Sequence, residues 1–161
     1  MLAFSYRTAS QSLRLALTAF LLLAVVGLGV AALQIYTKTS FTAHGALLHY
    51  RGDEATLQYP KSFTEMVEIT HAHAFTMPLL ALVLGLGIGF SSATERLKRL
   101  VVLAIFAGVT LELGVPWLVR YGPAWTVHLF SVAGMLLGGG IVAAIVVPLG
   151  DMWRPSRKPR L

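Results

Sequence analysis

The sequence of 161 residues contains no cysteine. This absence excludes disulfide bonds, thiolate metal sites, cysteine-ligated iron–sulfur clusters and the covalent attachment of a c-type haem. Any metal or cofactor must therefore be held by other side chains, of which the chain offers 5 histidines, 7 carboxylates and 5 methionines.

Charged residues are scarce as well. They make up 12% of the chain, against 56% for hydrophobic residues, and an ordinary soluble domain has about 25%. The apolar residues stand in long blocks, which excludes a typical water-soluble fold. The net charge of +6 suits nucleic acid or anionic lipid, but the basic residues flank the apolar blocks. We therefore expect membrane lipid, and no nucleic acid, as a partner.

Four apolar blocks are long enough to cross a bilayer, which takes about 20 helical residues. They span about residues 15–36, 69–90, 100–119 and 124–149. The first block is longer than a signal-peptide core and has no convincing cleavage motif after it, so we expect it to be an anchor. The fold class predicted for residues 1–161 is all-α: one integral membrane domain, a four-helix bundle.

The basic residues predict the orientation, because short segments rich in lysine and arginine stay in the cytoplasm. Most of them precede the first block, join the second to the third, or lie in the basic tail 152–161. We therefore expect cytoplasmic N- and C-termini in a multi-pass protein of a bacterial inner membrane. The loop 37–61 is then on the outer side. At its end, Ser62 and Glu65 have the spacing of a capping box, which predicts a helix from about Phe63.

With this orientation, all 5 histidines lie on the outer side of the membrane. His44 and His49 are in the outer loop, His71 and His73 are at the outer end of the second block, and His128 is at that of the fourth. The inner halves of the blocks contain no ionisable residue. Because histidine inside a bilayer is a functional candidate by default, we expect any chemistry to occur near the outer face.

The depth of these histidines suits a b-type haem held between helices. We predict His73 and His128 as its axial ligands. His71 and His73 are about 200° apart on a helix, so only one of them can face the bundle. Because Pro78 makes the helix phase uncertain, His71 is the substitute for His73.

Glu112 lies roughly 10 Å below the outer boundary of the third block, at the rise of an α-helix. A carboxylate at this depth is costly and therefore a functional candidate. We expect Glu112, or Glu68, to accept a proton from a quinol. The structural alternatives for Glu112 are an interhelical hydrogen bond, a contact with another subunit, or pairing with Arg120.

A further interpretation uses some of these residues as ligands of another metal. His44, His49 and Glu65, with Glu68 and His71, mix imidazole with carboxylate as zinc, copper or non-haem iron sites do. A metal-binding or transport protein follows from that interpretation, although the apolar inner halves argue against a continuous path.

Small-xxx-small spacing predicts close helix packing at three places. These are Gly85/Gly89, Gly134/Gly138 and Gly27/Ala31.

The segment Tyr59–Met77, YPKSFTEMVEITHAHAFTM, followed by Pro78, resembles a group of small four-helix bacterial inner-membrane proteins. Residues 116–121, PWLVRY, and 151–153, DMW, are similar too. That group is associated with multihaem c-type cytochromes in respiratory gene clusters. The resemblance implies membership of an electron-transfer complex, with His71 and His73, and after them His128, as the positions that matter.

Two classes of function follow. The first is a membrane subunit of a respiratory complex that relays electrons from quinol, through one b-type haem near the periplasmic face, to a periplasmic c-type cytochrome. The second is a non-catalytic anchor or assembly subunit. Its outer loop would dock a periplasmic protein and its glycine faces would pack against other membrane subunits.

Overall fold

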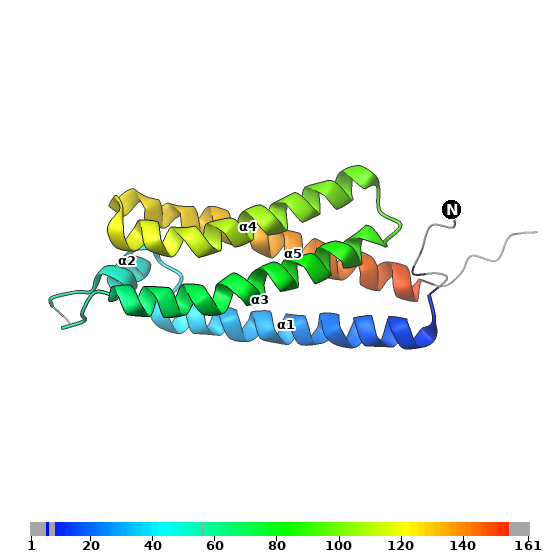
Figure 1. Ribbon diagram of the computed structural model, residues 1–161, viewed down its shortest axis with the longest axis horizontal. Coiled ribbons are helices and arrows are strands. Elements are labelled where there is room, and N and C mark those ends of the chain that lie inside the picture. Colours follow the sequence, from blue (N-terminus) through cyan, green and yellow to red (C-terminus); the bar gives the residue numbers. More distant parts are fainter. Residues whose placement is uncertain (1–5, 7–8, 56, 155–161) are drawn as a thin grey trace, which may run out of the picture.

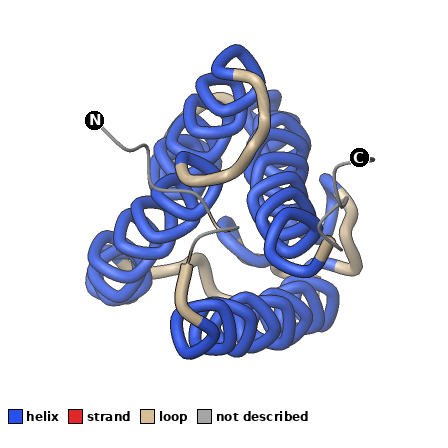
Figure 2. The backbone as a smooth tube through the Cα atoms, turned by 90° about the vertical axis from the view of Figure 1, so that its right-hand side faces the viewer, coloured by secondary structure: helices blue, strands red, loops and turns tan. Residues whose placement is uncertain are grey.

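A computed structural model describes residues 6, 9–55 and 57–154. Within these residues the chain forms helices and no strand: α1 (Gln11–Thr39), α2 (Ala43–Arg51), α3 (Phe63–Gly89), α4 (Glu95–Tyr121), the 3₁₀ helix η1 (Ala124–His128) and α5 (Leu129–Trp153). The long helices lie side by side along the longest axis (Figure 1), and an end-on view shows them arranged around a common centre (Figure 2). The predicted all-α four-helix bundle is confirmed.

The four predicted spans are present, and each helix extends beyond its apolar block. The membrane-spanning candidates are Gln11–Thr39, Phe63–Gly89, Glu95–Tyr121 and Ala124–Trp153. The predicted capping box is also confirmed. Ser62 Oγ accepts a hydrogen bond from the backbone N–H of Glu65, and the Glu65 carboxylate accepts one from the backbone N–H of Ser62 at 2.8 Å. This box starts α3 at Phe63, as the spacing indicates.

The helix α2 lies in the segment 37–61 that we expected to be a loop. It is short, and only part of its surface is apolar, so the search for long apolar blocks could not find it. The side-chain oxygen of Thr42 caps its first turn by accepting from the N–H of Gly45 at 2.9 Å. With Ala46 buried, α2 packs against α1, α4 and η1 at one end of the bundle (Figure 1). We call this the outer end, in keeping with the predicted orientation.

The closest helix packing is between α4 and α5, and two glycines make it possible. A Cβ atom on Gly108 would lie 2.7 Å from the backbone nitrogen of Leu137, and one on Gly140 would lie 2.7 Å from Cγ1 of Ile105. Neither glycine is in the spacing pairs singled out above. Gly134 and Gly138, by contrast, face open space.

The inner end is tied by polar contacts between distant segments. Asp151, near the end of α5, accepts hydrogen bonds from the backbone N–H of Ser92 and from its hydroxyl, the latter at 2.6 Å. Trp153 Nε1 donates to Thr18 Oγ1 at 3.0 Å, which joins α5 to α1. The hydroxyl of Tyr6 donates to the carbonyl oxygen of Gly87. These contacts join α5 to α1 and to the turn between α3 and α4, and join Tyr6 to α3.

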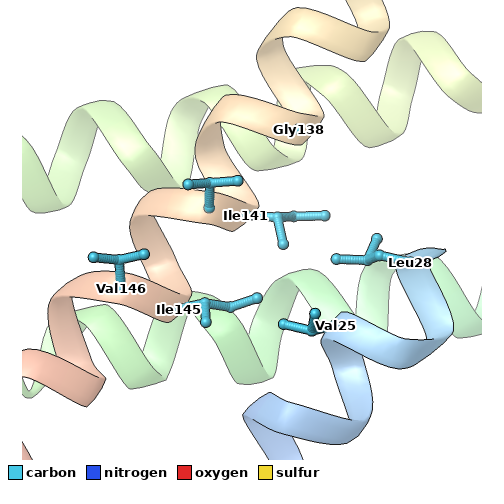
Figure 3. Close-up of a pocket in the computed structure, with 7 residues that line it drawn as sticks. Val25, Leu28, Gly138, Ile141, Ile145 and Val146 are labelled. Atoms are coloured by element: carbon cyan, nitrogen blue, oxygen red, sulfur yellow. The ribbon is translucent and has the colours of Figure 1, made fainter. Parts of the chain in front are cut away.

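Helix α1 is the least embedded of the long helices. Its one buried residue is Leu21. Between α1 and α5 lies an apolar groove of about 390 Å³ (Figure 3). It is lined by Val25, Leu28, Gly138, Ile141, Val142, Ile145 and Val146. The core of the molecule is therefore built mainly from α3, α4 and α5, and α1 lies along its side.

Candidate functional site

The alignment of α3 with α4 places the outer-end polar residues. Trp117 Nε1 in α4 donates a hydrogen bond to Thr70 Oγ1 in α3 at 2.7 Å, and the Trp117 ring meets that of Phe63 edge-on at 5.6 Å. The two helices run in opposite directions. Moving inward from this contact, His73 follows after about 4.5 Å and Glu112 after about 7.5 Å, at 1.5 Å per residue. These two side chains therefore lie at nearly the same depth.

Glu112 is half-buried and interacts electrostatically with residues of two other helices. One is His73 in α3. The other is Tyr50 in α2. Glu112 and His73, two of the predicted site residues, thus lie on neighbouring helices within range of an electrostatic interaction. The structure adds Tyr50, which the sequence analysis did not select.

The orientation of the His73 ring is fixed by its own helix. Its Nδ1 lies 2.8 Å from the carbonyl oxygen of Ile69, and the side chain is exposed. A carbonyl oxygen can only accept a hydrogen bond, so Nδ1 carries the proton in the neutral ring. The Nε2 atom is then left without a proton and can accept one from a ligand.

The structure places the other predicted membrane residues elsewhere. His71 is exposed, and its ring packs edge-on against Phe75 of the same helix at 5.7 Å. Glu68 is exposed on α3. His128 is exposed where η1 meets α5, at the N-cap of α5, and makes no side-chain capping bond. None of the three is hydrogen-bonded to His73 or Glu112, all of these being residues that the structure describes.

The alternative metal residues are engaged in other ways. Glu65 closes the capping box and forms an ion pair with Lys61, with 2.7 Å between Oε1 and Nζ. His49 packs edge-on against Tyr50 at 4.9 Å, and His44 is exposed on α2. Over residues 6, 9–55 and 57–154, no group of three or more histidines and carboxylates is placed to hold a metal ion.

The electrostatic environment of His49 lowers its pKa. Burial has the largest effect, and the positive charges of Lys61 and Lys38 add to it, while Glu65 acts in the opposite direction. Burial, together with the nearby Glu112 carboxylate, also raises the pKa of Tyr50 to about 12. At neutral pH the imidazole is therefore uncharged and the phenol keeps its proton.

Two arginines clamp the outer end. Arg51 donates from Nε to the carbonyl oxygen of Val119 at 2.6 Å and from Nη2 to that of Gly122 at 2.5 Å. It thereby satisfies carbonyl groups at the C-terminus of α4. Arg120, considered above as a partner for Glu112, instead donates to the carbonyl oxygen of Lys61 at 2.7 Å. Sequence reasoning missed Arg51 because it lies in a segment expected to be a solvated loop.

Comparison with protein families assigns this architecture. Residues 40–159 match the Aq_1264_TM family, a transmembrane helical domain. The chain belongs to the Aq_1264_TM family. The match covers α2 to α5 and therefore every site residue discussed above, whereas α1 lies outside it. Together with the four apolar helices, it identifies a multi-pass membrane protein. Searches among curated proteins and among solved structures give no match.

Proposed function

We propose that this Aq_1264_TM protein is a membrane subunit of a bacterial respiratory electron-transfer complex that oxidises quinol at its outer end. The observation that carries the proposal is the position of His73 and Glu112 at nearly the same depth on two neighbouring membrane-spanning helices. Two proton acceptors on neighbouring helices, one of them an imidazole with an unprotonated nitrogen, suit a quinol, because a quinol loses two protons when it is oxidised.

In the proposed reaction, His73 and Glu112 each accept one proton from the quinol. Both O–H bonds of the quinol break, and its two electrons leave the ring, which becomes a quinone. Nε2 of His73 takes one proton and the Glu112 carboxylate takes the other. The electrons pass singly to a one-electron acceptor, for which we propose the haem of a periplasmic c-type cytochrome in a partner subunit.

The distribution of polar residues supports an outward-facing site. Inward of His73 and Glu112, the helices α3, α4 and α5 carry no ionisable residue until the inner flanks, where Arg99 stands in α4 and Asp151 in α5. One chain therefore offers no histidine-based route across the membrane. Quinol would enter from the bilayer and give up its protons on the outer side.

The test is quinol oxidation in membranes that contain the assembled complex. His73→Gln and Glu112→Gln each remove a proton acceptor, and we expect turnover of a short-chain ubiquinol to fall about 100-fold or more. His71→Gln is the matched control, because His71 is on the same helix but packs against Phe75. Equal activity in the His73→Gln and His71→Gln complexes would contradict the proposal.

The b-type haem on His73 and His128 stays a prediction. The bond from Nδ1 of His73 to the Ile69 carbonyl is the type that orients a ligating imidazole. When bound, the haem would supply one-electron transfer. It would use the same Nε2 atom that the quinol needs, so the two occupants exclude each other. A reduced-minus-oxidised spectrum of the purified chain from a haem-replete host decides between them: a b-type spectrum lost in His73→Ala and His128→Ala would favour the haem.

The anchor function is the second candidate, and the exposure of α1 favours it. Only Leu21 of this helix is buried, so most of its apolar surface is free to contact lipid or another membrane subunit. If the chain is only an anchor, His73→Gln and Glu112→Gln would leave quinol oxidation unchanged. Deletion of residues 42–56 would prevent assembly of the complex.

A further inference from the structure

We propose that the apolar groove between α1 and α5 is a binding site for one phospholipid with an anionic headgroup. One acyl chain of the lipid lies in the groove, and the headgroup lies at the inner end of the two helices, beside Arg14 and Arg154. The proposal is independent of the proposed function, because the groove is lined by α1 and α5, whereas His73 and Glu112 are on α3 and α4.

The shape of the groove suits a flexible chain that enters from the bilayer. Ile141 and Ile145 of α5 line it as buried residues, and Leu28 faces them from α1 (Figure 3). Val142 and Val146, which also line it, are exposed, so the groove opens toward the surrounding lipid. A gap left empty would deprive its lining of dispersion contacts on one side. An acyl chain restores these contacts and joins α1 to α5 where their own side chains do not fill the space.

The length of the groove distinguishes an acyl chain from a helix of another subunit. On α5 the lining runs from Gly138 to Val146, which is about 12 Å at the rise of an α-helix. On α1 it comprises only Val25 and Leu28. A helix that crosses the hydrocarbon core extends over about 30 Å. The groove offers less than half of that length, so a single acyl chain is the occupant that it fits.

The depth of the groove suits a lipid of the leaflet at the inner end. Trp153 donates a hydrogen bond to Thr18, and its exposed ring is typical of the membrane interface. Counted from Thr18, the α1 lining lies about 10 to 15 Å deeper, and counted from Trp153, the α5 lining begins about 10 Å deeper, at Val146. One leaflet contributes about 15 Å to the hydrocarbon core, so its acyl chains reach the groove.

Basic residues lie at the inner end of the same two helices. Arg14 of α1 donates from Nη1 to the carbonyl oxygen of Met152 in α5 at 3.4 Å, which places its guanidinium group between the helices. Arg154, directly after α5, is exposed. The acidic residue nearest to it in α5, Asp151, is buried and accepts hydrogen bonds from Ser92. This end of α1 and α5 therefore presents positive charge to the membrane surface.

The charge and the groove together select the class of lipid. A zwitterionic phospholipid offers the same acyl chains but carries no net charge, whereas an anionic headgroup is attracted by each nearby arginine. The acyl chain then enters the groove at the depth that the headgroup position allows. A phospholipid such as phosphatidylglycerol satisfies both requirements.

The experiment measures the first lipid bound to the purified full chain by native mass spectrometry, with dioleoyl phosphatidylglycerol and dioleoyl phosphatidylcholine as probes. Wild type should bind phosphatidylglycerol about tenfold more tightly. Gly138→Leu places a side chain in the groove, because a Cβ atom there lies in open space, and we expect it to weaken binding of both lipids about tenfold. Gly139→Leu is the matched control, since Gly139 also faces open space but does not line the groove.

Arg154→Gln tests the headgroup position. It should weaken the binding of phosphatidylglycerol about fivefold and leave that of phosphatidylcholine unchanged. Arg96→Gln, which removes an exposed basic residue from the inner end of α4, should change neither. Equal effects of Arg154→Gln and Arg96→Gln would contradict the headgroup site.

Equal affinity of wild type for the two lipids would overturn the proposal, and so would equal binding by Gly138→Leu and Gly139→Leu. A dimer that Gly138→Leu alone dissociates, with lipid binding unchanged, would also overturn it and assign the groove to a second copy of the chain. If Gly138→Leu does not fold, wild type is crosslinked to phosphatidylglycerol that carries a diazirine near the end of one acyl chain. Crosslinks should concentrate in residues 25–28 and 138–146, and an even spread over the long helices would reject the groove as the site.

Discussion

Trp117 and Thr70 join α4 to α3 through a hydrogen bond of 2.7 Å between Nε1 and Oγ1. The Trp117 ring also meets the Phe63 ring edge-on and stacks on the Tyr121 ring, with 5.9 Å between the ring centroids of Trp117 and Tyr121. This one bond sets the register of two antiparallel helices, and with it the depth of Glu112 relative to His73. The position of the candidate site therefore depends on a tryptophan that lies outside the site.

Removal of the hydrogen bond between Trp117 and Thr70 should destabilise the fold and disturb the alignment of Glu112 with His73. Trp117→Phe keeps an aromatic ring but has no N–H donor, and we expect a loss of about 1 kcal/mol in the free energy of unfolding. Thr70→Val removes the acceptor from the other side. A double-mutant cycle, measured by denaturation in mild detergent, should give a coupling of about 0.5 kcal/mol or more. Strict additivity of the two variants would show that the bond does not couple the helices.

The clamp formed by Arg51 makes a prediction about local opening. Arg51→Ala removes both donors to the C-terminal carbonyl groups of α4, at a cost of about 1.5–3 kcal/mol for bonds to a charged group. Hydrogen exchange should accelerate in α2 and in residues 115–122, and remain slow in the middle of α5. Lys38→Ala, which changes an exposed cation on α1, is the control. The same exchange pattern in both variants would argue against the clamp.

The two kinds of glycine in α5 should respond oppositely to alanine. At Gly140 a Cβ atom would come within 2.7 Å of Ile105, so Gly140→Ala should destabilise the bundle by about 1–3 kcal/mol through overpacking. Gly138 has open space around it, and Gly138→Ala should stabilise the helix slightly. Thermal unfolding of the two variants in the same detergent makes the comparison. Equal midpoints would contradict the close packing of α4 on α5.

The chain should lose stability at high pH in a way that depends on Tyr6. Burial, with a smaller contribution from Asp151, raises the pKa of Tyr6 from 10.0 to about 12 in the folded state. The folded state therefore holds the proton more tightly than the unfolded state does. The resulting stabilisation is complete below pH 10 and is lost as the pH rises toward 12. Tyr6→Phe should be less stable at pH 8, through loss of the bond to Gly87, but should show a shallower decline above pH 10. A parallel decline in both proteins would contradict the assignment.

Much of the architecture could be predicted because bilayer thickness constrains it. A block of about 20 apolar residues has few options in a membrane other than a helix, so the spans followed from composition alone. The start of α3 followed from the chemistry of Ser62 and Glu65. The helix α2 could not be predicted in this way, because its stability comes from packing Ala46 and Tyr50 onto α4 and α5.

The candidate site was predictable only in part, because its geometry depends on the packing between helices. His73 and Glu112 were candidates because ionisable groups in a bilayer are expensive, and their proximity required the register set by Trp117. Tyr50 and Arg51 gave no signal, since a tyrosine and an arginine in an outer segment are ordinary. Helix spacing suggested Arg120 as a partner for Glu112. In the structure Arg120 donates instead to the carbonyl oxygen of Lys61, and this contact depends on the path that the chain takes between α2 and α3.

The most direct measurement of the central claim is the binding of a short-chain ubiquinone analogue to the purified chain in lipid nanodiscs. Quenching of tryptophan fluorescence reports the binding, because Trp117 lies one turn outward of the site. Wild type and His71→Gln should bind with equal affinity. His73→Gln and Glu112→Gln should each weaken binding by about tenfold, the loss of one strong hydrogen bond. Equal affinity in all four proteins, or a loss in His71→Gln alone, would contradict a quinol site at His73 and Glu112.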